Sequence, residues 1–230
     1  LSRRVLLNYA SLTQPLLSEN IKMQNDNNSK IDSDNNYNFF INKKLNKKDF
    51  ENYHQSKTLL QSKSNIYFNG ELNDESCFKL TEALMHHKNN LMTNSEHGNH
   101  INLYIQSPGG ALLPTLAVVD EILRSEIPVY TYIRGYAASA STLISVAGHH
   151  RIMYNHSLMM IHSVRTHQEV NTYNEVKDIY ENLDLFMKIV KDIYLENTNI
   201  DKKLLDELLL KDSWITSSRA LELGLVDQII

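Results

Sequence analysis

The pattern of hydrophobic and polar positions changes near Leu59. From there on, short apolar runs of strand length alternate with longer segments whose apolar residues recur every three to four positions, the spacing of one helix face. The expected strands are residues 65–68, 101–105, 129–133, 151–154 and 157–161. The expected helices are residues 75–91, 111–124, 172–197, 201–210 and 217–223. Strands that alternate with helices predict one layered α/β domain with right-handed crossovers.

The helical spacing also predicts which residues face the core. In helix 75–91 these are Cys77, Leu80, Leu84 and Leu91. In helix 111–124 they are Leu116, Val119 and Leu123. In helix 172–197 they are Ile179, Leu183, Phe186, Ile189, Val190 and Ile193. Because helix 172–197 is unusually long, we expect it to project beyond the domain.

The N-terminal part has a different composition. Residues 25–48 are dominated by Asn, Asp, Lys and Ser, so they cannot bury enough apolar surface to offset the entropy lost on ordering. We predict an N-terminal extension, residues 1–58, with an Asn-rich disordered segment and a short helix at 49–57, followed by a folded domain, residues 59–230. Because the chain begins with Leu1 rather than Met, we expect a processed form or a fragment from which any targeting segment is already missing.

Bulk properties narrow the functional class. The 230 residues carry a formal net charge of −4, so no basic field indicates a nucleic-acid partner. Cys77 is the single cysteine, which excludes a disulfide within the chain. No apolar run approaches the roughly 20 residues of a membrane span, so we expect no membrane partner.

Three features together indicate nucleophilic chemistry. A glycine turn at Gly135 is expected to end strand 129–133 and to lead into a helix that starts with Ser139, at the positive end of the helix dipole. A serine at a helix start is usually only an N-cap, and His162 or Asp212 alone is an ordinary strand-end or surface residue. In the order Ser, His, Asp they are the parts of a hydrolase triad. The N–H groups of the pair Gly109–Gly110 could face a developing oxyanion.

Residues 103–110, 135–139 and 160–162 resemble the ClpP family, the proteolytic subunits of ATP-dependent Clp proteases. The tail from Asp212 to Asp227 resembles it too, so the likeness runs from about Leu60 to the C-terminus. It implies a ClpP/crotonase-like superhelical ββα fold in which the long helix forms a handle. It also implies a serine endopeptidase site, whose residues are Ser139 as nucleophile, His162 as general base, Asp212 as the acid that orients the histidine, and the N–H groups of Gly110 and Ala140 as oxyanion hole.

The same resemblance implies the partners. We expect a homo- or hetero-oligomeric ring of seven subunits, with another ClpP-like subunit as the co-subunit of a mixed ring. An AAA+ Clp ATPase is expected to use the ATP, so this chain itself needs no cofactor, and unfolded polypeptides are the expected substrates. An organelle matrix of plastid type is the expected location, with the mitochondrion and the cytoplasm as alternatives.

Two departures from the family pattern modify this expectation. The family follows its histidine with Gln-Pro and a glycine pair, whereas residues 163–169 here read Ser-Val-Arg-Thr-His-Gln-Glu, so bulky or charged residues replace the proline and glycines. This stretch contains the substrate-strand candidates Ser163, Val164, Arg165 and Thr166, which would hold an extended peptide through backbone hydrogen bonds, so we expect reduced activity. Leu210 and Lys211 replace an acid–arginine pair that helps two rings communicate, and a lysine does not replace a bidentate arginine. We therefore expect weak ring stacking.

Two alternatives remain open at this stage. A ClpR-like subunit would join the barrel without cleaving peptides, although such subunits usually lack triad residues and this chain keeps all three. A crotonase-type acyl-CoA enzyme would use paired N–H groups on a thioester and needs no serine nucleophile. The histidine pairs at 86–87 and 149–150 lack a supporting cluster of carboxylates or cysteines, so we predict no metal site.

Overall fold

The computed structural model describes residues 59–62, 64–93, 100–166 and 172–230. The expected disordered segment 25–48, the short helix 49–57 and the polar loop 94–99 lie outside these residues. The strands are β1 (Leu59–Ser62), β2 (Asn65–Asn69), β3 (Ile101–Ser107), β4 (Val129–Ala138), β5 (His150–Met153), β6 (Leu158–Ile161), β7 (Ser213–Thr216) and β8 (Gln228–Ile229). The helices are α2 (Asp74–Thr93), α3 (Leu112–Leu123), α4 (Ala140–Val146), α5 (Tyr173–Asn197), α6 (Lys202–Leu209) and α7 (Ser217–Glu222).

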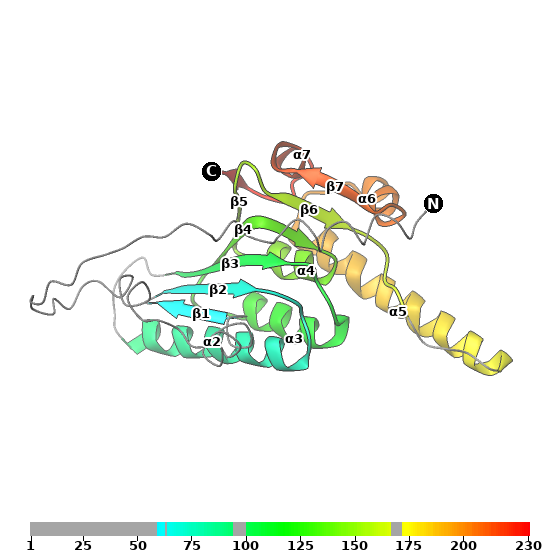
Figure 1. Ribbon diagram of the computed structural model, residues 1–230, viewed down its shortest axis with the longest axis horizontal. Coiled ribbons are helices and arrows are strands. Elements are labelled where there is room, and N and C mark those ends of the chain that lie inside the picture. The colour runs from blue at the N-terminus through cyan, green and yellow to red at the C-terminus, as the bar shows by residue number, and fades with distance from the viewer. Residues whose placement is uncertain (1–58, 63, 94–99, 167–171) are drawn as a thin grey trace, which may run out of the picture. The chain divides into compact units, whose positions relative to one another are not determined.

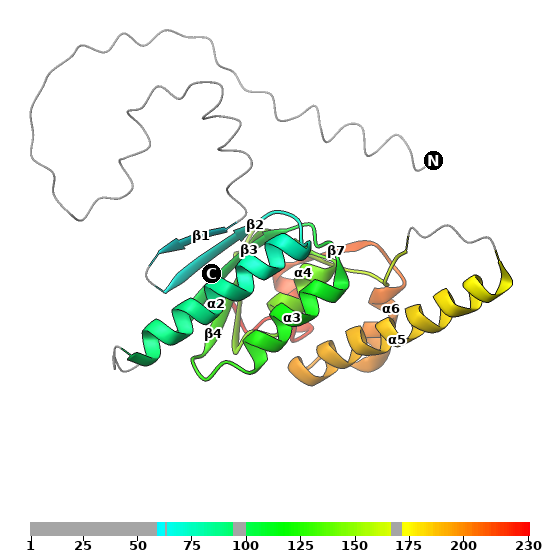
Figure 2. The ribbon, with the colours of Figure 1, turned by 90° about the horizontal axis from the view of Figure 1, so that it is seen from below.

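Within the described residues, eight strands form one sheet with the order β1-β2-β3-β4-β5-β8, and β6 pairs with both β4 and β7. Pairing from β2 through β5 to β8 is parallel, and β1 and β7 run antiparallel to their neighbours. Helices α2 and α3 lie along one face of this sheet, with α4 and α5 beside them (Figure 1, Figure 2). The alternation of strands and helices predicted from the sequence is confirmed.

The core lies between the sheet and its helices. β3 has strict alternation, with every second residue from Ile101 to Ser107 buried, as expected for a strand with one face covered. In α2, Cys77, Leu80 and Leu84 are buried, as the spacing predicted. The aligned apolar faces of α2 and of the central strands therefore form one continuous core.

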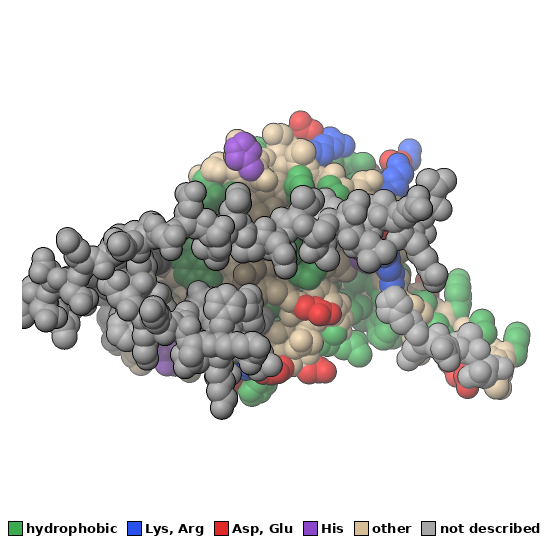
Figure 3. Space-filling model, in the orientation of Figure 1, with side chains coloured by type: hydrophobic (Ala, Val, Ile, Leu, Met, Phe, Trp, Pro, Cys, Tyr) green, Lys and Arg blue, Asp and Glu red, His purple; other side chains and the backbone are tan. Residues whose placement is uncertain are grey.

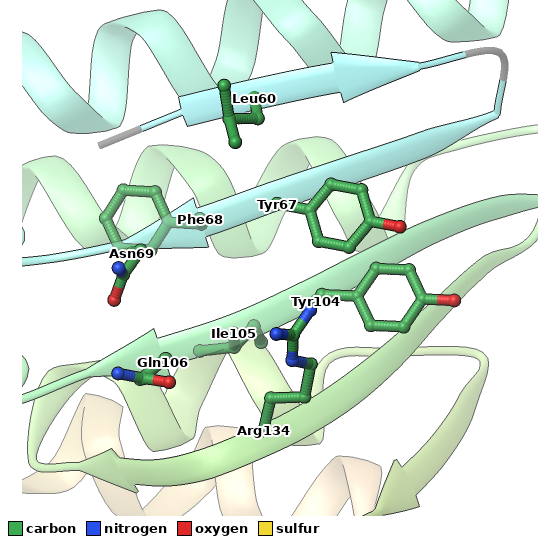
Figure 4. Close-up of a pocket in the computed structure, with 8 residues that line it drawn as sticks. All are labelled: Leu60, Tyr67, Phe68, Asn69, Tyr104, Ile105, Gln106 and Arg134. Atoms are coloured by element: carbon green, nitrogen blue, oxygen red, sulfur yellow. The ribbon is translucent and has the colours of Figure 1, made fainter. Parts of the chain in front are cut away.

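The sheet face opposite α2 and α3 carries a row of aromatic side chains. The rings of Tyr67, Tyr104 and Tyr132 stack across β2, β3 and β4 with centroid separations of 4.6 Å for both pairs. Figure 4 shows Tyr67 and Tyr104 side by side near Arg134, whose guanidinium lies 5.8 Å from the Tyr67 ring centroid. They line a hollow of about 190 Å³ that also includes Leu60. Cross-strand stacking of this kind stabilises a sheet face that none of the described helices covers.

The glycine at 135 does not end the strand as the sequence predicted. β4 continues to Ala138, and Gly135, at φ 77°, marks the kink where β4 changes its partner from β5 to β6. The buried Ser157 hydroxyl accepts a hydrogen bond from the Gly135 N–H at 2.9 Å and donates to the Ile133 carbonyl at 3.0 Å. Because one side chain satisfies both backbone groups, the strand bends without ending.

The predicted inward face of α3 was partly wrong. Leu123 is 42% exposed and Leu116 is only half-buried, although Val119 is buried as expected. The residues that face the sheet are Thr115, Val118, Val119 and Ile122. The apolar residues of this helix occur on more than one face, so hydrophobicity alone could not identify the buried one.

Helix α5 projects from the domain, as the sequence predicted (Figure 1). Thr172 and Glu175 form a capping box at its N-terminus. Of the six residues in its predicted stripe, only Val190 is buried, because the stripe was assigned along the whole helix and only the C-terminal half packs on the domain. Hydrophobic side chains are spread along the projecting half (Figure 3), where Tyr173 is 83% and Tyr180 72% exposed.

Arg151, on β5, forms hydrogen bonds with the end of α5, the turn after α7 and the residue before β8. Its guanidinium forms a bidentate ion pair with Asp227 just before β8, and its Nη1 donates to the carbonyls of Asn197 at 2.6 Å and of Gly224 at 3.1 Å. Burial alone would raise the pKa of Asp227, but the hydrogen bonds and charge of Arg151 outweigh it, so the pKa lies below its usual value.

We predict that Asp227→Asn lowers the free energy of unfolding at pH 7 by about 2–4 kcal/mol, because it leaves the buried Arg151 without its counter-charge. A carboxyl group with a depressed pKa in the folded state stabilises the fold above its unfolded pKa of roughly 3.9. That contribution is lost as the pH falls through the lower folded pKa. Urea unfolding between pH 3 and pH 7 measures both effects.

The control is Glu222→Gln, which breaks the exposed pair with Arg219 and should cost less than about 1 kcal/mol. Equal losses for Asp227→Asn and Glu222→Gln at pH 7 would contradict the structural role given to Arg151.

Candidate active site

Ser139 lies between β4 and α4 with φ 57° and ψ −132°, the one non-glycine residue with positive φ among those the structure describes. Such a backbone conformation costs about 1–3 kcal/mol and persists only where its surroundings impose it. The Ser139 N–H donates to the Met160 carbonyl at 2.8 Å, and its carbonyl accepts from the N–H of Thr142 at 3.0 Å and from its Oγ1 at 2.5 Å. Ser139 occupies the N-cap position, but its hydroxyl makes no capping hydrogen bond.

The turn after β3 approaches Ser139 so closely that it requires glycine. A Cβ at Gly109 would lie 2.7 Å from the Ser139 Cβ and 2.9 Å from the Ala140 nitrogen. A Cβ at Gly110 would lie 2.0 Å from the Leu72 carbonyl oxygen. Both glycines have positive φ, 90° and 147°. The glycine pair therefore lets two backbone segments meet beside the serine.

Two residues with unpaired backbone N–H groups line the same cavity as Ser139. Gly110 and Ala140 both line it, and neither N–H donates to any acceptor in the described part of the chain. Unpaired N–H groups beside a nucleophile can stabilise the negative charge that develops on a carbonyl oxygen. The structure thus brings together the two residues that the sequence predicted as oxyanion hole, and their role stays a prediction.

His162 follows β6 and lines the cavity with Ser139. Its Nδ1 lies 2.6 Å from the Ser163 carbonyl oxygen. Since a carbonyl only accepts, Nδ1 carries the proton in this contact, and the neutral ring then has its free lone pair on Nε2. This is the tautomer that a general base toward a serine needs. No hydrogen bond joins the ring to the Ser139 hydroxyl, although the structure describes both side chains.

Asp212 is not brought to the histidine. Its carboxylate accepts a hydrogen bond from the Arg165 guanidinium, and the two side chains are 59% and 55% exposed. Asp212 is also absent from the residues that line the cavity, whereas Arg165 lines it. The predicted triad is therefore assembled here only in part, and Arg165 takes the place that a histidine would have beside the acid.

The expected substrate strand packs against the helices. Ser163, Val164 and Arg165 line the cavity with Ser139, while Thr166 lines an adjoining hollow beside α5. The Ser163 N–H donates to the Leu209 carbonyl at 2.9 Å, and the Val164 N–H lies 3.2 Å from the Met187 sulfur. These two donors are already used, so they do not form an open edge for an extended peptide. Residues 167–169 of the altered run lie outside the described residues.

The cavity measures about 580 Å³ and its lining is a mixture of polar and apolar side chains. Leu112, Leu143, Met160, Val164 and Val190 contribute apolar side chains to its lining. A cavity of this size accommodates a side chain and the adjacent peptide unit of a substrate.

The described residues contain no group of three or more His, Cys, Asp or Glu side chains that could hold a metal ion. Of the histidine pairs, His149 accepts a hydrogen bond from the Val129 N–H through Nδ1 at 3.1 Å. None of the helices that the structure describes is both long and apolar enough to cross a membrane.

A strained serine, a histidine and two residues with unpaired N–H groups line one cavity, and nucleophilic hydrolases use the same set of groups. The sequence matches the Clp protease family over residues 47–230, so the chain belongs to this family. It is similar to "ATP-dependent Clp protease proteolytic subunit 1" of Mycobacterium bovis and of Mycobacterium tuberculosis. Each is 27% identical over 174 residues, which cover 74% of this chain and 84% of the relative. The predicted ClpP-like α/β fold with a handle helix is confirmed.

Sequence reasoning missed two features of this site. The ion pair of Arg165 with Asp212 joins residues 47 positions apart, and no sequence pattern connects them. The hydrogen bond from Thr142 to the Ser139 carbonyl could have been predicted from the sequence, because a threonine three residues after a helix start often donates back to the backbone.

We predict that Gly109→Ala destabilises the fold more than Gly135→Ala. Both positions have positive φ, which costs an alanine about 1–2 kcal/mol. At Gly109 the added methyl would also meet Ser139 and the backbone of Ala140, for a total of about 3 kcal/mol or more. At Gly135 the nearest atom belongs to the flexible Gln106 side chain, at 3.0 Å, which can move.

Urea unfolding of both variants measures the difference. If the two substitutions cost the same, the close approach of Gly109 to Ser139 is not a structural constraint.

Proposed function

We propose that this chain is a proteolytic subunit of an ATP-dependent Clp protease and that its own peptidase activity is low. Membership of the Clp protease family indicates serine peptidase activity and ring assembly with Clp ATPases in general. The observation that carries the proposal is the position of Ser139, at a strained junction that leaves its hydroxyl uncapped in the same cavity as His162.

In the proposed reaction, the Ser139 hydroxyl attacks the carbonyl carbon of the substrate peptide bond, and Nε2 of His162 takes the hydroxyl proton. The negative charge on the carbonyl oxygen is held by the N–H groups of Gly110 and Ala140. His162 then gives its proton to the leaving amine, so the peptide bond breaks and an ester with Ser139 remains. A water molecule hydrolyses this ester with the same histidine as base.

Two observations support low activity. The first is the ion pair with Arg165, which keeps the Asp212 carboxylate from stabilising the protonated His162. The second is the use of the Ser163 and Val164 N–H groups by α6 and α5. Each missing backbone hydrogen bond to a substrate removes about 0.5–1.5 kcal/mol of net binding, so losing these two weakens peptide binding by a factor of about 5 to 150.

We further propose that the chain works in a mixed ring with a second ClpP-like subunit, against which an AAA+ Clp ATPase docks and feeds unfolded polypeptides. Leu210 is 84% exposed and Lys211 follows it. Neither offers the paired acid and arginine that the resemblance places at a contact between rings, so stacking of this chain with itself is proposed to be weak. The exposed apolar residues on α5, such as Tyr180, favour a partner surface beyond the domain.

A non-catalytic ClpR-like role is the second candidate, and the Arg165–Asp212 pair favours it. The two proposals differ in one property, which is whether Ser139 reacts. A serine-directed fluorophosphonate probe measures that property directly, because it forms a covalent bond only with an activated hydroxyl.

We predict slow labelling of the full chain by a fluorophosphonate probe and complete loss of labelling in Ser139→Ala. The control Ser163→Ala removes another hydroxyl from the same cavity and should keep the label. Cleavage of a fluorogenic peptide by the same samples should be weak. Absence of any label that depends on Ser139, with an intact fold, refutes the peptidase proposal and supports the ClpR-like role. Fast peptide cleavage by the chain alone refutes the proposal of low activity.

We also predict that Arg165→Leu raises the labelling rate about two- to fivefold, because it frees Asp212 from a pair worth up to about 1 kcal/mol at an exposed position. Asp212→Asn in the Arg165→Leu background should cancel the gain. Arg219→Leu breaks a similarly exposed ion pair away from the cavity and should change nothing. A labelling rate that is unchanged or lower in Arg165→Leu would show that Arg165 does not restrain the acid.

A further inference from the structure

A buried chain of hydroxyl groups connects the long helix α5 to the backbone of Ser139. The Thr142 Oγ1 lies 2.5 Å from the Ser139 carbonyl oxygen and also forms a hydrogen bond with the phenol oxygen of Tyr194. Thr142 is fully buried and Tyr194 is 2% exposed. Ser139 and Tyr194 both line the cavity, and the buried Thr142 forms hydrogen bonds with both of them.

The direction of these bonds follows from counting protons. The Ser139 carbonyl only accepts, so the one proton of the Thr142 hydroxyl is used in that bond. The bond between Thr142 and Tyr194 then requires that the phenol donates to Thr142. Burial raises the pKa of Tyr194, and the hydrogen bond with Thr142 opposes this only in part, so the phenol keeps its proton at neutral pH.

This arrangement fixes the rotamer of Thr142. A threonine hydroxyl in a helix can turn toward a carbonyl or away from it, and without the phenol its orientation is set by the bond to Ser139 alone. With Tyr194 in place, the proton of the hydroxyl and one of its two lone pairs are used, so the hydroxyl stays directed at the Ser139 carbonyl. Because the peptide unit of Ser139 has a strained conformation, each bond that holds it helps to keep the serine side chain facing the cavity.

We propose that Thr142 and Tyr194 are positioning residues for the nucleophile, which hold the Ser139 peptide in its reactive conformation through the hydroxyl chain from α5. The proposal rests on the proposed function, since it needs Ser139 to react. Neither side chain touches the reacting atoms in this role. They act through the orientation of the Ser139 backbone.

The experiment uses the full chain and a fluorophosphonate probe at several concentrations, which separates the probe's binding constant from its maximal inactivation rate. Tyr194→Phe removes only the phenol oxygen, and Thr142→Val removes the hydroxyl at nearly constant volume. We expect each to lower the maximal inactivation rate about three- to tenfold, the range for losing one buried hydrogen bond, with the binding constant unchanged. Thr142→Ser keeps the hydroxyl and should retain most of the wild-type rate.

Thr131 provides the matched control. Its buried hydroxyl donates to the Ser145 carbonyl at 2.7 Å, the same kind of bond to the same helix but away from Ser139. Thr131→Val should lower the melting temperature as much as Thr142→Val does and leave the inactivation rate unchanged. The double variant Thr142→Val/Tyr194→Phe should be no slower than about the slower single variant, because the two residues act as one unit.

The outcomes separate this inference from the proposed function. If the wild-type chain is not labelled at Ser139, both the proposed function and this inference are refuted. If the wild-type chain is labelled and the two single variants react at its rate, the hydroxyl chain does not position the nucleophile, and the proposed function stands. If Thr131→Val slows labelling as much as Thr142→Val, the effect is a general loss of stability and the inference is also refuted.

Discussion

The backbone conformation of Ser139 is the constraint on which the rest of the site depends. A serine with φ 57° gains nothing locally, because its hydroxyl caps no helix and its backbone is strained by about 1–3 kcal/mol. The surrounding fold supplies the compensation. The Met160 carbonyl accepts a hydrogen bond from the Ser139 N–H, and Thr142 donates to the Ser139 carbonyl. Gly109 has no side chain, which leaves room for the Cβ of Ser139. Each contact comes from a different part of the chain, so the serine is held only in the complete domain.

The same fold treats the three triad positions unequally. Ser139 directly follows β4 and His162 directly follows β6. These two strands pair in parallel, and this pairing sets the separation of the two residues. Asp212 lies just before β7, and its side chain is more than half exposed. Its carboxylate pairs with Arg165 instead of His162. An exposed ion pair contributes little energy, so small changes around Arg165 shift the acid between its two partners. The nucleophile is thus built into the core, while the acid depends on its surface environment.

The sequence predicted most of the elements because their apolar spacing is regular and because glycines and serines marked the junctions. It could not show that β4 continues through Gly135, since the bend depends on the Ser157 hydroxyl from the turn before β6. Motif order identified Ser139 correctly as the residue at the strand–helix junction. The ion-pair partner of Asp212 could not be predicted, because the partner of a long charged side chain depends on distances in the folded protein rather than on spacing in the sequence.

A crystal structure of the chain covalently labelled by a fluorophosphonate probe tests the central claim most directly, since the phosphoryl oxygen of the adduct occupies the position of the oxyanion. The account predicts that the label is on Ser139, that this residue keeps its positive φ, and that the oxygen lies about 2.7–3.1 Å from both the Gly110 and the Ala140 nitrogen. An adduct whose oxygen points away from both N–H groups, or a Ser139 that has relaxed to negative φ, would contradict it.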